Sequence, residues 1–216
     1  MNSQIRSRER VVDHGEVFTS EREVNAMLDL VVNETHRIDS RFLEPACGNG
    51  NFLVEVLKRK LSVVSDRYHK SQIEFERHSV IAVGSIYGVD LLEDNVIHCR
   101  DRLFDAFDAI YRRHYGSFCC EDYRTSIRFV LTRNILWGDA LTMKSICGSD
   151  TPIVFSEWSA VNGSMVKRRD YSLAHLLTYQ PMEGLNLFSD LGEEAFIPKP
   201  VKEFPLAHYA KLHQHA

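Results

Sequence analysis

The stretch FLEPACGNGNFL, residues 42–53, decides the fold. A short apolar run ends at Glu44, and Pro45 keeps a helix from passing through it, so we expect a strand that ends at Glu44. Gly48 and Gly50 then make a tight turn, and apolar residues spaced by three and four predict a helix after it. A glycine turn between a strand and a helix usually holds a ligand at the helix N-terminus.

Strands and helices alternate outward from this turn. Ser20 and Glu23 match a capping box ahead of an apolar stripe, which predicts a helix upstream. The uncharged run Val80–Val89 predicts a buried central strand, residues 134–139 a third strand and residues 152–155 a fourth. This alternation predicts an α/β fold whose mostly parallel sheet is covered by helices on both faces. We expect the sheet to be short of its last strands on the C-terminal side.

The character of the sequence changes near residue 160. Residues 1–159 carry the alternating pattern and are expected to form one core. Residues 160–216 contain four of the six prolines and few periodic apolar runs, so we expect an irregular C-terminal extension or docking tail there. Within it, residues 167–169 (Lys-Arg-Arg) are either a solvated charge run or contacts to nucleic-acid phosphates.

Composition narrows the class of protein. The chain has 216 residues, 44% hydrophobic and 26% charged, which is typical of a folded globular protein and excludes collagen, a coiled coil and disorder throughout. A net charge of −4, from 26 Lys and Arg against 30 Asp and Glu, excludes a uniformly basic nucleic-acid coat but leaves room for a local basic face. No apolar run is long enough for a membrane span, and we expect no secretory signal. The five cysteines are odd in number and lack a CxxC pair, so we expect a cytoplasmic protein without a disulfide scaffold or a zinc site.

Carboxylates at the predicted strand ends indicate the chemistry of the turn. Glu44, Asp90 and Asp139 end the first three strands, and the carboxyl ends of parallel strands meet at one ligand crevice. The turn has neither the GxGxxG pattern of dinucleotide sites nor the Gly-Lys-Ser/Thr of a phosphate loop. An acid at the strand end suits a ligand that carries an ammonium group. The plainer alternative is that the three acids only cap the helices that follow them.

The turn also resembles a known family. Residues 44–50 (EPACGNG) look like the S-adenosylmethionine loop of the class I amino-group DNA methyltransferases, especially the adenine-methylating modification subunits of restriction systems. Three further segments are similar to this family in the right order. Residues 14–20 (HGEVFTS) resemble the segment before the helix that closes over the methionine end, residues 86–91 (IYGVDL) the second strand, and residues 138–141 (GDAL) the exit of the third strand.

The resemblance implies a Rossmann-like methyltransferase fold, S-adenosylmethionine as the cofactor, and methyl transfer to nucleic acid, foremost to an adenine amine in DNA. In this family pattern Glu44 offsets the methionine ammonium, Asp90 accepts the ribose hydroxyls and Asp139 meets the adenine amine of the cofactor. The implied cofactor-binding residues are Phe18, Thr19, Glu44, Pro45, Ala46, Gly48, Gly50, Asp90, Leu91, Asp139 and Ala140.

The sequence differs from the family in the catalytic element. After its fourth strand the family has Asn, Asp or Ser, then Pro-Pro and an aromatic residue, whereas no two prolines are adjacent here. The corresponding segment reads Ser156-Glu157-Trp158-Ser159. In one interpretation it is catalytic: Ser156 or Glu157 accepts from the target amine and Trp158 stacks on the flipped base. In the other, methyl transfer has been lost and Trp158 is a packing residue or an interface anchor.

Two functions therefore stand at the level of sequence. The first is an S-adenosylmethionine-dependent nucleic-acid methyltransferase. The second is a catalytically degenerate, cofactor-binding subunit that acts with a partner in a restriction-modification or defence system. Both have DNA as the expected target and a protein partner that supplies target recognition, because nothing the size of the family's recognition domain follows residue 159. Neither needs a membrane or a metal.

Overall fold

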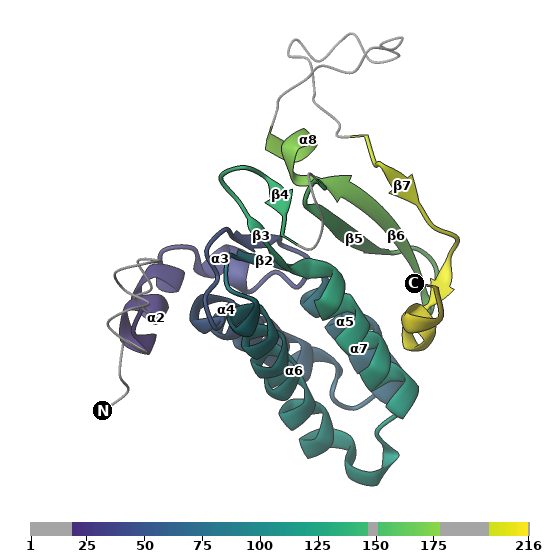
Figure 1. The fold of residues 1–216 in the computed structure, drawn as a ribbon. Helices are drawn as coiled ribbons and strands as arrows, with labels where there is room; N and C mark the ends of the chain where they lie inside the picture. Colours follow the sequence, from purple (N-terminus) through teal and green to yellow (C-terminus); the bar gives the residue numbers. More distant parts are fainter. Residues whose placement is uncertain (1–18, 147–150, 178–198, 216) are drawn as a thin grey trace, which may run out of the picture.

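The fold is α/β, and the predicted glycine turn follows the first strand of its central sheet. The computed structural model describes residues 19–146, 151–177 and 199–215. Three parallel strands, β1 (Phe42–Glu44), β2 (Ile86–Asp90) and β3 (Ile135–Asp139), lie side by side, and the short antiparallel strand β4 (Lys144–Ser145) follows β3 (Figure 1). The first strand ends at Glu44 as predicted, and helix α4 begins seven residues later at Asn51.

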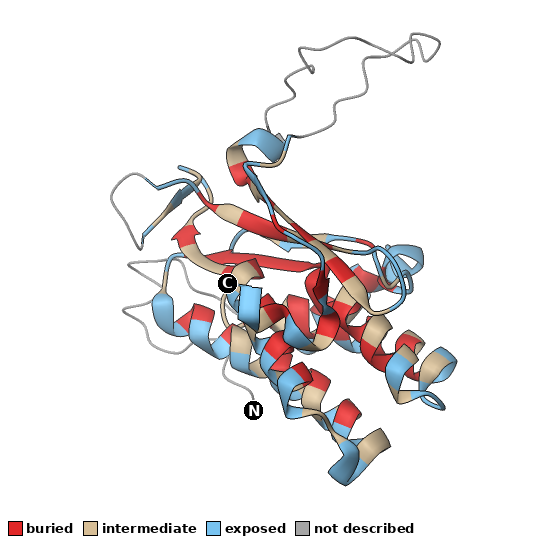
Figure 2. Ribbon diagram, turned by 90° about the vertical axis from the view of Figure 1, so that its right-hand side faces the viewer, coloured by how far each residue is buried: buried red, intermediate tan, exposed pale blue. Residues whose placement is uncertain are grey.

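Long helices cover one face of this sheet. They are α4 (Asn51–Tyr68), α5 (Gln72–Gly84), α6 (Glu93–Tyr115) and α7 (Glu121–Asn134), with the shorter α2 (Glu21–Asp29), α3 (Val32–Thr35) and 3-10 helix η1 (Gly116–Phe118). The expected capping box begins α2, where the Ser20 hydroxyl accepts from the backbone N–H of Glu23. Buried residues lie on the helix faces turned toward the sheet (Figure 2). No helix in the described parts of the chain is long and apolar enough to cross a bilayer.

The run Val80–Val89 is divided between two elements, so the expectation of one long strand is wrong. Helix α5 continues to Gly84, and only Ile86–Asp90 forms strand β2. Both parts are buried. An uncharged run of ten residues looks the same in a buried helix end and in a buried strand, because periodicity cannot separate the two when both faces are apolar.

A second, antiparallel sheet packs against the other face at β2 and against helices α5 and α7. It consists of β5 (Val154–Ala160), β6 (Met165–Ser172), β7 (Lys202–Glu203) and β8 (Ala207–His208), and helix α8 (Leu173–Leu177) follows β6. Tyr87 and Val89 of β2 pack against Phe155 of β5 in a small core of their own. The expectation that residues 152–155 form a fourth strand of the mostly parallel sheet is therefore wrong. Strand β5 instead pairs with β6, antiparallel, along its whole length.

The predicted boundary after residue 159 falls inside this β hairpin. The register joins Ser159 to Lys167 and Ala160 to Val166, so the described part of residues 160–216 is not an irregular tail. The last described segment, 3-10 helix η2 (Tyr209–His215), packs on α7, and its Leu212 is 2% exposed. Periodicity could not predict this packing, because it is made by single apolar residues at irregular spacing.

The basic residues 167–169 point to alternate faces of β6. Arg168 is buried, pairs with Asp170 at 2.9 Å and lies over the ring of Phe204. Lys167 pairs with Glu203 at 3.1 Å, and Arg169 with Glu157 at 3.3 Å. The run is therefore neither wholly solvated nor a continuous phosphate-binding surface, because a strand sends successive side chains in opposite directions.

A buried lysine fastens the beginnings of β1 and β2. Lys60 of α4 is fully buried, and its ammonium donates to the carbonyl oxygens of Ile38 and Ser40 and to the hydroxyl of Ser85. The first two acceptors lead into β1 and the third leads into β2. Removal from water lowers the pKa of Lys60 to about 7.

This pKa predicts a rise of stability with pH. Between pH 7 and about 10.4, the ordinary lysine value, the unfolded chain holds a proton on Lys60 that the folded chain has released. Raising the pH therefore favours the folded state, by at most about 1.4 kcal/mol per pH unit. We expect the free energy of unfolding of the parent, minus that of Lys60→Met, to increase over this range in denaturant titrations. Lys58→Met, whose ammonium pairs with Glu55 on the surface, is the control, and parallel curves for parent and Lys60→Met would contradict the assignment.

Candidate functional site

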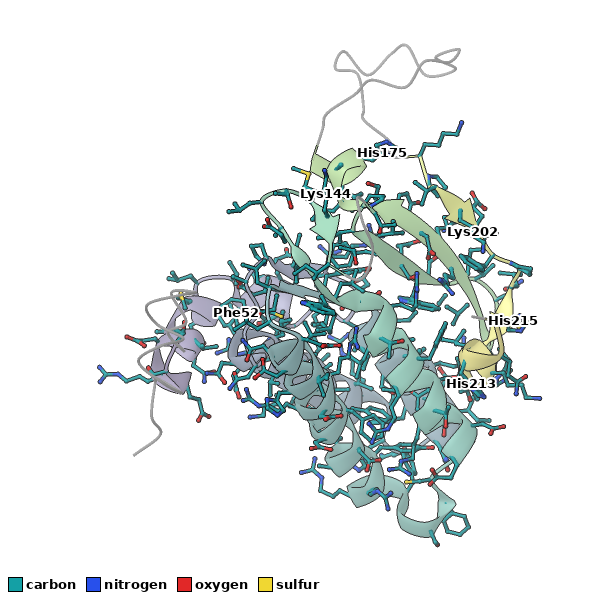
Figure 3. The ribbon with its side chains drawn as sticks, in the orientation of Figure 1. Phe52, Lys144, His175, Lys202, His213 and His215 are labelled. Atoms are coloured by element: carbon teal, nitrogen blue, oxygen red, sulfur yellow. The ribbon has the colours of Figure 1, made fainter. Side chains whose placement is uncertain are left out.

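A pocket of about 720 Å³ lies where the three parallel strands end beside the N-terminus of α4. This volume is within the range of small-molecule and cofactor sites. The side chain of Phe52, labelled in Figure 3, marks its place beside α4. Its lining comes from α2 and the residue before its cap, the end of β1, the glycine turn, the start of α4, the ends of β2 and β3 and the segments that follow them: Thr19, Met27, Glu44, Pro45, Ala46, Cys47, Gly48, Asn49, Asn51, Phe52, Asp90, Leu91, Leu92, Asn95, Gly138, Asp139, Ala140 and Leu141.

Almost all the residues predicted to bind cofactor meet in this pocket. Nine of them line it: Thr19, Glu44, Pro45, Ala46, Gly48, Asp90, Leu91, Asp139 and Ala140. Gly50 does not, because it is buried beneath the turn at φ +86°, and a β-carbon there would lie 2.6 Å from Sγ of Cys99. Phe18 lies outside the described residues.

The glycine turn is fixed against β2 by backbone groups. The N–H of Cys47 donates to the carbonyl of Val89 at 2.9 Å, and the N–H of Gly48 donates to the carboxylate of Asp90 at 2.8 Å. The N–H of Gly50 closes the turn on the carbonyl of Cys47 at 2.8 Å. Gly48 at φ +52° and Gly50 both have left-handed backbone, which favours glycine.

Asp90 has a structural role in addition to its place in the pocket. It is 9% exposed and accepts from the N–H of Leu92 at 2.9 Å and from Asn95 at 3.2 Å, besides the N–H of Gly48. Leu92 is the N-cap residue of α6 and Asn95 donates through its side-chain amide, so Asp90 fixes the entry to α6 but caps none of the backbone N–H groups of the helix. A carboxylate has about four lone-pair sites, which leaves room for about one ligand hydroxyl rather than the expected two.

Asp139 also makes a local turn. Its carboxylate accepts from the N–H of Leu141 at 2.9 Å and from the hydroxyl of Thr142 at 3.0 Å. These hydrogen bonds lower the pKa of Asp139. The group is therefore ionised and oriented at the end of β3, with acceptor capacity left for a ligand amine.

Glu44 differs from the other two acids because its charge is poorly compensated. Within the described residues its carboxylate accepts only from the N–H of Ala46, at 3.4 Å, and no basic side chain pairs with it. Partial burial raises its pKa above the ordinary value. The carboxylate therefore gains from a cation that enters the pocket.

The remaining lining residues escaped the sequence analysis for different reasons. Asn49, Asn51 and Phe52 lie in or next to the quoted turn, and their adjacency could have identified them. Met27 reaches the pocket from α2 and Asn95 from α6. Only the packing of these helices around the turn brings the last two residues there.

The segment predicted to be catalytic lies elsewhere. Trp158 packs closely on the backbone of Gly84, where a β-carbon would lie 3.0 Å from atoms of the indole side chain. Trp158 is 6% exposed, and its indole N–H donates to Asn134 at 3.3 Å. Gly84 precedes β2 and Asn134 precedes β3, so Trp158 lies by the strand ends opposite the pocket.

Ser156 and Glu157 are engaged in the same region. The hydroxyl of Ser156 is buried and donates to Asp170 at 2.7 Å, and Glu157 pairs with Arg41 at 3.0 Å as well as with Arg169. Neither residue lines the pocket. The expectation that this segment receives a target base is thus corrected in favour of packing, because its indole has no exposed face for a base to stack on.

Comparison with known proteins gives no match: no family model, no curated protein and no solved structure matches the chain.

Asp90 and Asp139 form a matched pair for a stability test. We expect Asp90→Asn to lower the free energy of unfolding by about 1–3 kcal/mol, since an amide nitrogen would face donors that now find an oxygen. Asp139→Asn should change it far less, because its hydrogen bonds stay within one surface turn. Urea titration of both variants measures the difference. Equal decreases in the free energy of unfolding would contradict the structural role of Asp90, which is to join the glycine turn to the start of α6.

Trp158 should behave as a core residue. We expect Trp158→Ala to lower the free energy of unfolding by about 3–5 kcal/mol, the usual cost of removing a buried large aromatic ring. Phe118→Ala is the control, because Phe118 is 80% exposed. Thermal or denaturant unfolding of both variants checks this, and a Trp158→Ala protein as stable as the parent would argue for an exposed, base-stacking indole.

Proposed function

We propose that this chain binds S-adenosylmethionine in the strand-end pocket and serves the methylation of nucleic acid. The observation that carries the proposal is the half-buried carboxylate of Glu44, which lacks a basic partner among the described residues and lies beside a glycine turn. Such a group favours a ligand that brings its own positive charge. S-adenosylmethionine brings two, an ammonium and a sulfonium.

The surroundings of Glu44 complement the rest of an amino-acid group. The first turn of α4, at Asn51 and Phe52, lines the same pocket, and Gly50 caps this helix without a side-chain acceptor. The free N–H groups of a helix N-terminus attract a carboxylate. A carboxylate on one side and a helix N-terminus on the other suit the zwitterionic end of the cofactor.

The same charges disfavour phosphate-bearing cofactors. Three carboxylates line the pocket, from Glu44, Asp90 and Asp139, and no lysine or arginine is among the lining residues. A dinucleotide or a nucleoside triphosphate would place several negative charges beside these carboxylates with no lysine or arginine in the lining to offset them. An uncharged nucleoside can use the acceptor sites of Asp90 and Asp139, which supports an adenosine group next to the amino-acid end.

The methyl acceptor that we propose is an amino group of a nucleic-acid base, foremost adenine in DNA. The family resemblance of residues 44–50 and of the three segments in order with them supports this class. A purified chain incubated with methyl-labelled cofactor and DNA, alone and with the products of co-expressed neighbouring genes, tests it.

The position of Trp158 favours the cofactor-binding subunit over an enzyme that acts alone. The segment Ser156–Ser159 is the only counterpart of the family's catalytic element in the sequence, and it lies away from the pocket. We therefore expect methyl transfer only when a partner supplies the acceptor and the stacking surface. Transfer to DNA by the purified chain alone would favour the enzyme, whereas absence of transfer with every partner would remove the methylation role.

The proposed role of Glu44 has a direct binding test. We expect Glu44→Gln to weaken S-adenosylmethionine about tenfold or more, because the ammonium loses its ionised partner, and to leave methylthioadenosine, which has no amino-acid end, nearly unaffected. Affinity of the parent should also fall as the pH drops through the raised pKa of Glu44, since only the ionised acid attracts the cation.

Isothermal calorimetry with both ligands measures these affinities. Asp139→Asn is the control: it should weaken both ligands alike, since the proposal places Asp139 at the adenine and both ligands carry that group. Equal weakening of both ligands by Glu44→Gln, or no binding of S-adenosylmethionine by the parent at millimolar concentration, would contradict the proposal.

A further inference from the structure

We propose that Arg102 of α6 is a positioning residue, which holds the glycine turn in the shape that recognises the amino-acid end of the cofactor. This inference rests on the proposed function for the identity of the ligand. The contacts that support it belong to the described residues alone.

One guanidinium nitrogen of Arg102 holds both asparagines of the turn. Its Nη1 donates to the carbonyl oxygen of Asn49 at 2.8 Å, to the side-chain oxygen of Asn49 at 2.8 Å and to that of Asn51 at 2.7 Å. Asn49 and Asn51 line the pocket, and Arg102 does not. Arg102 therefore positions two lining residues without lining the pocket itself.

The turn needs such a contact because its backbone is intrinsically loose. Asn49 lies between Gly48 and Gly50, both at positive φ, and glycine loses more conformational freedom on ordering than any other residue. The hydrogen bond to Asp90 fixes Gly48 from the side of β2. Arg102 fixes the next residues from the side of α6, so the turn is held on both sides.

The same contact extends to the segment that enters α2. The side-chain amide of Asn51 donates to the carbonyl of Thr19 at 3.1 Å, and Thr19 precedes the capping residue Ser20. Thr19 and Met27 of α2 both line the pocket. The chain of contacts from Arg102 through Asn51 thus sets where α2 begins relative to the turn.

These contacts predict which part of a ligand depends on Arg102. The turn and the start of α4 lie next to Glu44, the group that we assign to the ammonium. The adenosine end is assigned to the ends of β2 and β3, whereas the hydrogen bonds of Arg102 within the described residues go to Asn49 and Asn51. Loss of Arg102 should therefore weaken ligands that have an amino-acid end and spare those that lack it.

The test compares Arg102→Met, Arg102→Lys and Arg112→Met with the parent. Arg112 is the matched control, since it lies on the same helix, 55% exposed, and pairs with Asp108. The probes are S-adenosylmethionine and methylthioadenosine, measured by calorimetry. Amide hydrogen exchange of residues 47–52 without ligand gives a second readout.

We expect Arg102→Met to weaken S-adenosylmethionine about tenfold, to change methylthioadenosine less than about twofold, and to speed exchange in the turn. Arg102→Lys should restore part of the affinity, because an ammonium can donate but cannot replace the planar guanidinium. Equal weakening of both probes, or unchanged affinity for both, would overturn the inference.

Failure of the proposed function gives a different result. If the parent binds neither probe, the ligand is wrong, and hydrogen exchange alone decides the role of Arg102. Faster exchange of residues 47–52 in Arg102→Met than in Arg112→Met would support the positioning role. Equal exchange in the two variants would overturn it.

Discussion

The hydrogen bond from the N–H of Gly48 to the carboxylate of Asp90 is the constraint on which the candidate site depends. It joins the turn after β1 to the end of β2, and the same carboxylate accepts from Leu92, the N-cap residue of α6, and from Asn95 in the first turn of that helix. Two neighbouring βα units thereby share one buried acidic side chain. Gly48, Asp90 and Asn95 of this junction line the pocket. Glu44, which lies opposite Gly88 in the register of β1 on β2, also lines it and has no basic partner among the described residues.

Local signals were enough to predict the strand ends and the glycine turn that form the pocket, although they did not separate the end of α5 from β2. Pro45 ends a strand, and Gly48 and Gly50 supply positive φ in the turn. The rule that parallel strands present their carboxyl ends at one edge then places Glu44 beside the acids of β2 and β3. The pocket residues that sequence analysis could not find, such as Met27, depend on how a helix packs over the turn, which no spacing in the sequence encodes.

The second half could not be predicted because its pattern is ambiguous. A short apolar run such as residues 152–155 suits a parallel strand or an antiparallel hairpin equally well. Its partner β6 hides the usual alternation, since Arg168 is a buried residue whose charge is matched by Asp170. In the register of β5 on β6, Trp158 packs against Gly84, which precedes β2, and therefore lies away from the pocket. The family resemblance placed this segment at the site, and the hairpin explains why it is not there.

A crystal structure of the chain with S-adenosylhomocysteine tests the central claim most directly. This product keeps the amino-acid and adenosine ends of the cofactor, so it reports both halves of the pocket at once. The account predicts the ligand amino group within hydrogen-bond distance of Glu44, one ribose hydroxyl on Asp90 and the adenine near Asp139. Ligand bound at another place, or a strand-end pocket that stays empty at saturating ligand, would contradict it.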